Sequence, residues 1–262
     1  MGAGLYLHVP FCRRKCPYCN FYSVPAQPEL LTAYTAAVCR NLRHYGNAAQ
    51  PERVDTVYFG GGTPSLLLPA QIAQILETAA EQFALSADAE ITLEANPATV
   101  TPEQLRELRH AGINRLSLGV QSLSDVQLKR LGRLHTAQEA VETVYAAAEA
   151  SFRNLSCDLM LALPEQTADE LEQTISRLVQ LPITHVSAYL LKVEQGTPFA
   201  VQHVAECCPD DDTAADLYLQ AVEQLGAAGF LQYEISNFAK AGFESRHNCK
   251  YWHCEPYLGI GP

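Results

Sequence analysis

The sequence predicts an α/β protein in which short apolar strands alternate with longer helices. Three observations carry this prediction: apolar strand-like runs recur along the chain, each leads to a segment with helical periodicity, and proline opens two of those helices, where its missing N–H costs little. Such alternation requires parallel strands joined by right-handed crossovers. The pattern alone leaves open whether the sheet curls into a barrel or opens as a doubly wound sheet.

The expected elements follow one another in six strand–helix units. Strands are predicted at residues 5–8, 54–59, 91–95, 116–120, 155–161 and 186–193. Helices are predicted at residues 29–48, 69–83, 102–111, 126–131, 137–150, 167–181 and 213–228. A seventh short strand is expected at residues 232–235.

Length, composition and charge exclude several classes of protein. The 262 residues are 48% hydrophobic and 18% charged, with a mean hydropathy of -0.06, which is typical of a compact chain with a buried core. A net charge of -11 disfavours nucleic acid as a partner. The sequence shows neither an apolar run long enough for a transmembrane segment nor the basic start of a secretion signal. We therefore expect a cytoplasmic protein, with peripheral membrane contact left open.

Three of the nine cysteines form the most informative motif. Cys12, Cys16 and Cys19 follow the first predicted strand with the spacing C-x3-C-x2-C. Three thiolates on a short loop can each ligate one iron of a cubane cluster and leave the fourth iron open. An odd number of cysteines in a reducing compartment also favours metal binding over disulfides. The alternatives are a zinc site, which the C-x2-C spacing alone would favour, and three unrelated thiols.

Further polar residues stand at the carboxyl ends of the predicted strands, where parallel α/β folds place their sites. They are Gly60, Gly61, Gly62, Thr63, Glu94, Asn96, Gln121, Ser122, Asp158, Tyr189 and Lys192. The glycine run has no Walker lysine, so it does not indicate a triphosphate loop; glycine instead lets the backbone approach a ligand closely. We expect these residues and the cysteines to face one cavity.

Motifs along nearly the whole chain are similar, in order, to those of the radical S-adenosylmethionine (SAM) family. They are LYLHVPFCRRKCPYCNFYS (5–23), YFGGGTPS (58–65), ITLEANP (91–97), NRLSLGVQS (114–122), LGRLH (131–135), CDLMLALPEQ (157–166), SAYLLKVEQGTPF (187–199) and RHNCKYW (246–252). The branch that they resemble contains oxygen-independent coproporphyrinogen III oxidase and the heme chaperone HemW. This resemblance implies a partial (β/α)6 barrel related to the TIM barrel.

The resemblance also implies two cofactors. Cys12, Cys16 and Cys19 match the ligands of a [4Fe–4S] cluster, whose open iron binds the amino and carboxylate groups of SAM. One electron from the cluster then cleaves the sulfonium, so a reductant such as flavodoxin or ferredoxin is an implied partner. The positions that match SAM contacts are Tyr6, Tyr18, Gly61, Gly62, Thr63, Glu94, Gln121, Arg133, Asp158 and Lys192.

For two of these positions, the residues alone suggest a different role from the one that the resemblance implies. Without the resemblance, Arg133 would be interpreted as a solvated charge at a helix end. Lys192 is either a cavity contact or a surface lysine whose stem covers apolar neighbours.

Two features distinguish the branches. The oxidases resemble one another in a fourth cysteine two residues after the third, and Phe21 stands there in this chain. HemW-like proteins carry an H-N-x-x-Y-W box, present as His247, Asn248, Tyr251 and Trp252. The box implies heme as bound cargo and a heme-accepting apo-protein as partner. The alternative function is oxidative decarboxylation of coproporphyrinogen III, and whether the chain is an enzyme stays open.

From the residues alone, a local role for the box competes with heme binding. In that interpretation His247 makes local hydrogen bonds, while Tyr251 and Trp252 pack under the barrel. The neighbouring Cys249, His253 and Cys254 are expected to be incidental, and so are Cys207 and Cys208.

The same comparison predicts how the chain is divided. Residues 1–236 are expected to form the radical SAM core, and residues 237–262 the start of a C-terminal region that contains the box. The chain stops at Pro262 inside what resembles the motif GIGPGAHS, so a further C-terminal domain of its relatives is expected to be missing.

Overall fold

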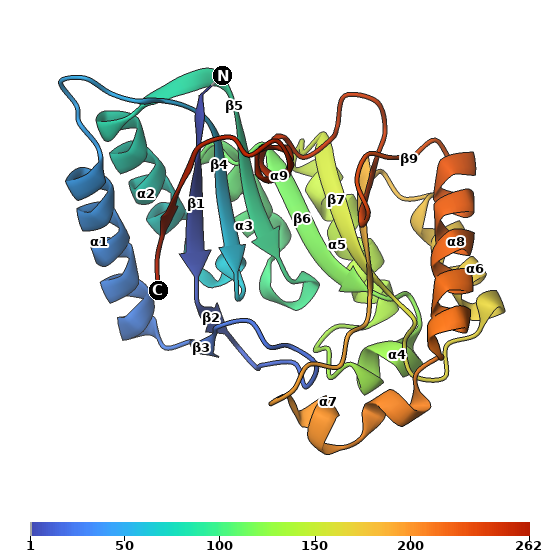
Figure 1. Cartoon of the computed structure of the whole chain (residues 1–262). Coiled ribbons are helices and arrows are strands. Elements are labelled where there is room, and N and C mark those ends of the chain that lie inside the picture. The colour runs from blue at the N-terminus through green and yellow to red at the C-terminus, as the bar shows by residue number, and fades with distance from the viewer. Residues whose placement is uncertain (1) are drawn as a thin grey trace.

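A computed structural model describes residues 2–262, and its main feature is one large, mostly parallel sheet (Figure 1). The strands are β1 (Ala3–Val9), β2 (Phe11–Cys12), β3 (Val24–Pro25), β4 (Arg53–Gly61), β5 (Ala84–Ala95), β6 (Arg115–Gln121), β7 (Asn154–Leu161), β8 (His185–Leu190), β9 (Leu231–Gln232), β10 (Asn237–Ala239) and β11 (Tyr257–Ile260). The large sheet has the order β11-β1-β4-β5-β6-β7-β8-β10-β9, and β2 pairs with β3 separately. The strands β1 and β4 to β8 overlap the six predicted strands and pair in parallel, so the predicted sheet is confirmed, although β5 begins at Ala84 and β8 already ends at Leu190.

The helices lie on the outside of this sheet. They are α1 (Pro28–Tyr45), α2 (Pro69–Gln82), α3 (Pro102–His110), α4 (Asp125–Arg130), α5 (Ala137–Glu149), α6 (Ala168–Leu178), α7 (Pro198–Val201), α8 (Asp211–Ala227) and α9 (Arg246–Trp252), with 3-10 turns at Pro64–Leu66, Pro97–Thr99 and Val204–Cys207. Threonine N-caps fix several starts: the hydroxyls of Thr101, Thr136 and Thr167 each accept a hydrogen bond from the backbone N–H three residues on. The seven helices predicted from periodicity are all present, within a few residues at each end.

The arrangement of helices decides between the two folds that the pattern left open. Consecutive strands lie side by side from β4 to β8, and Figure 1 shows α1 and α2 beside one edge of the sheet, α3 and α5 behind it, and α6 and α8 beside the other edge. A doubly wound sheet would carry helices on both faces and reverse its strand order. The sheet is therefore a partial barrel, open between β11 and β9 in the part of the chain that the structure describes.

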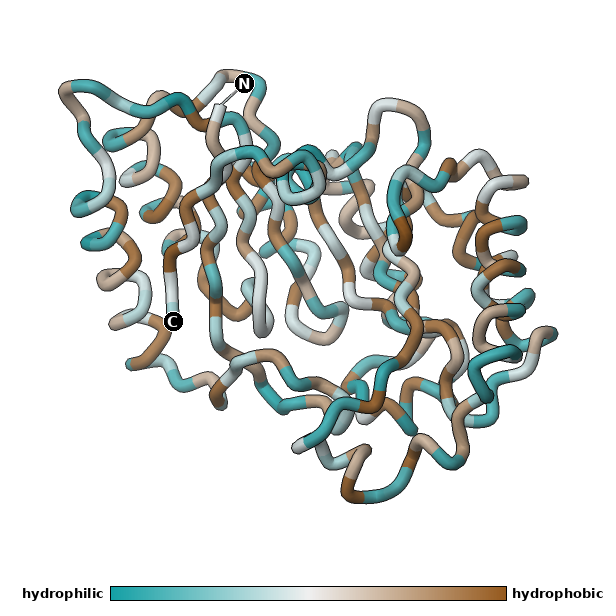
Figure 2. The backbone as a smooth tube through the Cα atoms, viewed as in Figure 1, coloured by the Kyte–Doolittle hydropathy of each residue, from teal (hydrophilic) through white to brown (hydrophobic). Residues whose placement is uncertain are grey.

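A large apolar core holds most of the helices against the sheet. Helices α1 to α6 and α8 contribute buried side chains to it, for example Leu42 of α1, Ile72 of α2, Leu105 of α3, Val144 of α5 and Leu171 of α6. Figure 2 shows mainly hydrophilic residues along the side of α1 that faces away from the sheet. This segregation is what the helical spacing of apolar residues predicts.

One predicted strand is wrong in detail. Residues 232–235 do not form a single strand but the end of β9 and a turn into β10, which pairs antiparallel with β8 and β9. The carboxylate of Glu234 accepts hydrogen bonds from the backbone N–H of Ser236 (3.0 Å) and from the side chain of Asn237. A side chain that binds the backbone two residues on favours a turn over an extended strand.

Residues 237–262 are attached to both edges of the barrel. β10 pairs with β8, α9 crosses the amino ends of the strands, and β11 pairs in parallel with β1. The carboxylate of Glu90 accepts hydrogen bonds from the N–H groups of Arg246 (3.1 Å) and His247 (3.0 Å), which anchors the start of α9. A division of the chain at residue 236 stays a proposal.

None of the helices within residues 2–262 is both long enough and apolar enough to cross a bilayer.

Candidate cofactor site

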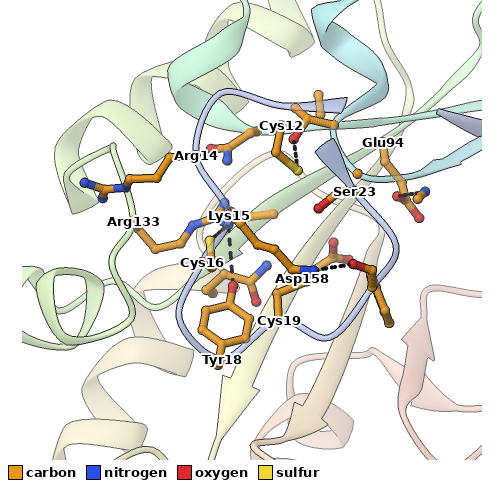
Figure 3. A pocket seen from close by; sticks show the side chains of 18 of the residues that line it. Cys12, Arg14, Lys15, Cys16, Tyr18, Cys19, Ser23, Glu94, Arg133 and Asp158 are labelled. Carbon is orange, nitrogen blue, oxygen red and sulfur yellow. Dashed lines mark hydrogen bonds between the residues drawn. The ribbon is translucent and has the colours of Figure 1, made fainter. Parts of the chain in front are cut away.

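A cavity of about 290 Å³ opens at the carboxyl ends of the strands (Figure 3). Most of the residues predicted to form the site line it: Cys12, Cys16, Tyr18, Cys19, Gly61, Gly62, Thr63, Glu94, Gln121, Arg133 and Asp158. Figure 3 shows the cysteine loop crossing the cavity, with Glu94 and Asp158 reaching it from the strands. The expectation that residues from distant motifs face one cavity therefore holds for these residues and for Asn96 and Tyr189, whereas it is wrong for Gly60 and Ser122, which do not line the cavity.

The loop that carries the cysteines is fixed at several points. Cys12 ends β2, which pairs with β3 at the far end of the loop. The carbonyl of Pro17 accepts a hydrogen bond from the N–H of Phe199 at 3.0 Å, and Cys19 N–H donates to the carbonyl of Cys16 at 3.1 Å. The ring of Tyr18 packs on a small apolar cluster of Leu131, Met160, Leu163 and Phe199. Such anchoring positions the three thiols before any ligand binds.

Polar hydrogens point at two of the three sulfurs. Thr63 Oγ1 lies 3.6 Å from Cys12 Sγ, and Arg133 Nη1 lies 3.6 Å from Cys16 Sγ and 3.5 Å from the hydroxyl of Tyr18. Arg133 Nη2 donates to the carbonyl of Gly119 at 2.6 Å. Hydrogen bonds to cysteine sulfur suit sulfurs that carry negative charge in an iron–sulfur cluster and tune its potential.

The glycine strip at the end of β4 lies directly against the cysteine loop. Gly62 N–H donates to the carbonyl of Val9 at 2.8 Å, and a Cβ on Gly62 would lie only 2.7 Å from the carbonyl oxygen of Phe11. Gly61 has φ +111°, a backbone conformation that side chains disfavour. Glycine is therefore required here for the close approach of the strip to the backbone of the cysteine loop, while its predicted approach to a ligand stays a prediction.

Two half-buried carboxylates give the cavity its electrostatic character. Glu94 accepts hydrogen bonds from the hydroxyl of Tyr58 at 2.8 Å and from the N–H of Gly61 at 3.1 Å. Burial, and then the charge of Asp158, raises the pKa of Glu94 to about 7. Burial likewise raises the pKa of Asp158, against the hydrogen bond from Ser117. A cavity with two such carboxylates favours a ligand group that carries positive charge.

Arg115 is a buried charge outside the cavity lining that acts on both carboxylates, and the sequence did not single it out. It stands at the start of β6 with 1% of its surface exposed, and its charge lowers the pKa of both Glu94 and Asp158. Its Nε and Nη1 atoms have no hydrogen-bond partner within the described residues. A lone arginine at a strand end looks like a surface charge, so only the barrel geometry reveals its position.

The raised pKa of Glu94 predicts a pH dependence of folding. Because the folded protein binds this proton more tightly than the unfolded chain, the stabilisation from Glu94 is fully present below about pH 4.5 and is lost as the pH rises to about 7. Between pH 5 and pH 8, Glu94 should lower the free energy of unfolding of the wild type by on the order of 2 kcal/mol. Urea unfolding should show that this decline is absent in Glu94→Gln. The exposed Glu81→Gln on α2 is the control, and an unchanged slope in Glu94→Gln would contradict the assignment.

Two predicted SAM contacts do not line the cavity. The hydroxyl of Tyr6 forms a hydrogen bond with His8 Nδ1 at 3.1 Å, and its ring stacks with that of Tyr58 at a centroid separation of 6.1 Å. Lys192 pairs with Glu194 at 2.9 Å, and its side chain is 81% exposed. The position of Lys192 matches its interpretation as a surface lysine, and a role for either residue toward SAM stays a prediction.

The H-N-x-x-Y-W box lies at the opposite end of the barrel from the cysteines (Figure 1). His247 is completely buried, with hydrogen bonds of 2.8 Å between Nδ1 and Thr56 Oγ1 and between Nε2 and the hydroxyl of Tyr251. The local hydrogen bonding that competes with heme ligation is thus present, and neither ring nitrogen is free in this conformation. The expectation that Trp252 and Tyr251 pack under the barrel is wrong, because they are 61% and 38% exposed.

The remaining cysteines do not assemble a further site. All nine cysteines are free thiols, with Cys39 and Cys157 in the core and Cys207 and Cys254 exposed. Within residues 2–262, no three His, Cys, Asp or Glu side chains converge closely enough to hold a single metal ion.

The fold and the site together define a class: a partial α/β barrel with a cavity at the carboxyl ends of its strands, lined by a three-cysteine loop and a glycine strip. The sequence model of the radical SAM superfamily matches residues 6–178. The chain belongs to the radical SAM superfamily and, within it, to the group that contains the heme chaperone HemW.

Individual relatives support this placement. Heme chaperone HemW of Escherichia coli is 40% identical over 98% of this chain and 68% of its own length, and HemW of Bacillus subtilis is 38% identical with the same coverage. Radical S-adenosyl methionine domain-containing protein 1, mitochondrial, of Mus musculus is 43% identical over 99% of this chain, which spans 59% of that relative.

A solved structure supports the fold. Coproporphyrinogen III oxidase (HemN) from Escherichia coli, a radical SAM enzyme, superimposes with a TM-score of 0.85 at 24% identity and covers 99% of this chain and 63% of its own. The predicted partial barrel is confirmed by this likeness, which concerns the fold alone.

Proposed function

We propose that the chain is a radical SAM protein that binds a [4Fe–4S] cluster and SAM and acts as a heme chaperone, passing heme to acceptor proteins. The observation that carries the cofactor part is the convergence of three cysteines and the glycine strip on one cavity. The heme part rests on the H-N-x-x-Y-W box and on the relatives named heme chaperones. Nine free cysteines suit a reducing compartment such as the cytoplasm.

The residues that line the cavity fit these cofactors. Cys12, Cys16 and Cys19 would hold the cluster, which when bound supplies an open iron for SAM and the electron that cleaves its sulfonium. Arg133 has a buried Nε without a hydrogen-bond partner within the described residues, a donor suited to the carboxylate of SAM. Glu94 and Asp158 suit its positively charged groups. The hydrogen bond between Arg133 and Tyr18 orients both side chains at the cavity wall.

Exposed aromatic side chains provide the surface for heme. On α9, Trp252 and Tyr251 offer flat apolar rings to the solvent, whereas His247 is enclosed. A porphyrin ring gains from stacking on such side chains. We therefore assign the first contact with heme to Trp252.

Heme titration tests this assignment. The wild-type protein should shift the Soret band of heme on binding, and Trp252→Ala should weaken binding by roughly tenfold, since one exposed aromatic contact is worth about 1 to 1.5 kcal/mol. Tyr45→Ala, an equally exposed aromatic at the end of α1, is the matched control. No Soret shift in the wild type would reject heme binding, and equal weakening in both variants would reject the box as its site.

The oxidase alternative is distinguished at Phe21. This side chain lines the cofactor cavity and is 65% exposed, at the position where the oxidases resemble one another in a fourth cysteine. A phenyl ring cannot ligate metal or transfer hydrogen as a thiol does. Formation of a vinyl product from coproporphyrinogen III, in an anaerobic assay with reductant and SAM, would overturn the chaperone proposal.

A further inference from the structure

Positive charge gathers at one place on this acidic protein. Six of the 18 lysines and arginines lie on the cysteine loop, on α4 and on the turn after α4; we call Arg13, Arg14, Lys15, Lys129, Arg130 and Arg133 the basic patch. All except Arg133 are exposed. A local excess of this kind in a chain of net charge -11 creates a field of opposite sign to the rest of the surface.

The patch surrounds a surface hollow of about 650 Å³ next to the cofactor cavity. Arg14, Lys15 and Arg133 line both the hollow and the cavity. Figure 3 shows these three side chains around Cys16, whose sulfur lies 3.6 Å from Arg133. A single layer of side chains therefore separates the hollow from the predicted cluster.

The charges of the patch are largely uncompensated. Arg13, Arg14 and Lys15 donate hydrogen bonds to the backbone carbonyls of Ala98, Gly132 and Phe21, which are neutral partners. Within residues 2–262, Arg130 is the one member of the patch in an ion pair, with Glu165.

The remaining lining of the hollow is mostly uncharged. Asp125 contributes its carboxylate, which accepts a hydrogen bond from the N–H of Ala137 at 2.7 Å. Leu134 is 45% exposed and gives the hollow a small apolar spot. A basic rim around a small apolar centre suits a brief encounter with an acidic protein surface.

We propose that the basic patch docks an acidic one-electron carrier protein, from which the electron passes to the cluster through the wall formed by Arg14, Lys15 and Arg133. The inference rests on the proposed function, since it needs a cluster on Cys16 and its two partner cysteines. In the exchange the carrier is oxidised by one electron and the cluster is reduced by one, with no bond made or broken. Charge complementarity selects the partner, because the rest of this surface repels acidic proteins.

The test uses a flavodoxin in its hydroquinone form as the probe. At low salt, Lys129→Glu and the double variant Lys15→Glu/Lys129→Glu should weaken flavodoxin binding and slow the bimolecular reduction of the cluster, by roughly tenfold for the double variant. Both differences should narrow at 0.5 M salt, where exposed charges are screened. Arg153→Glu, the same change of charge on an exposed residue at the amino end of β7, is the matched control and should bind like the wild type.

Two further measurements separate the possible failures. Iron content and reduction by photoreduced deazaflavin, a small uncharged donor, show whether each variant still holds a reducible cluster. If clusters are intact and both patch variants bind flavodoxin as tightly as Arg153→Glu does, the docking surface is refuted while the proposed function stands. If the wild type itself holds no iron, the proposed function fails, and a binding difference between the variants would still identify the patch as an acidic-protein surface.

Discussion

Cys16→Ser is expected to yield a folded protein that has lost its iron–sulfur cluster. Serine is protonated at neutral pH, and its oxygen is a hard, poor ligand for iron in such a cluster. The substitution therefore removes one of the three protein ligands that hold the cluster. The thiol is half-buried on a loop, and its loss should change the free energy of unfolding by no more than about 1 kcal/mol. The same result is expected for Cys12→Ser and Cys19→Ser.

Iron and acid-labile sulfide, measured per chain after anaerobic purification, check this result. The wild type should contain about four of each, the stoichiometry of a [4Fe–4S] cluster. Cys254→Ser changes an exposed thiol far from the cavity and should retain the full content. Zinc without iron in the wild type would establish the zinc alternative, and an unaltered cluster in all three loop variants would remove the cysteines from the site.

Much of the site was predictable because parallel strands impose a simple rule. Residues such as Glu94 and Asp158 lie far apart in the sequence, but Glu94 stands at the end of β5 and Asp158 in the carboxyl half of β7, and the carboxyl ends of parallel strands meet at one edge. The cysteine spacing and the glycine run are local signals that do not depend on distant contacts. The strand and helix positions followed from periodicity for the same reason.

The rest depends on contacts that sequence patterns do not encode. From the sequence, Arg115 would be interpreted as a surface charge, but the barrel buries it. Lys192 lies just after β8, where its side chain is exposed to solvent and pairs with Glu194. The position of α9 is set by Glu90, more than 150 residues away in the sequence, which accepts hydrogen bonds from the start of that helix. The basic patch likewise needs the cysteine loop and α4 to meet in space.

His247→Ala is expected to destabilise the protein by about 3 kcal/mol, or roughly 6 to 12 °C in Tm. The substitution removes a fully buried ring that packs against Tyr58 with a centroid separation of 5.2 Å, and it leaves the buried hydroxyl of Thr56 without its partner. A Cβ on the neighbouring Gly4 would lie 3.0 Å from the ring, so the pocket is closely packed and has little room to collapse around alanine. Trp252→Ala, on the same helix but exposed, should change stability by no more than about 0.5 kcal/mol.

The pH dependence of this loss separates a structural histidine from a heme ligand. Burial, and then the charge of Lys250, lowers the pKa of His247 to about 3, so its ring stays neutral in the folded protein. The unfolded chain gains a proton below about pH 6.5, and the stabilisation from His247 is therefore complete above that pH and lost as the pH falls toward 3. The stability difference between wild type and His247→Ala should accordingly shrink by about 2 kcal/mol between pH 7 and pH 5. If the stability difference between wild type and His247→Ala stays constant with pH, His247 is not held neutral in its pocket. If Trp252→Ala binds heme more weakly at unchanged stability, heme is assigned to the exposed side of α9.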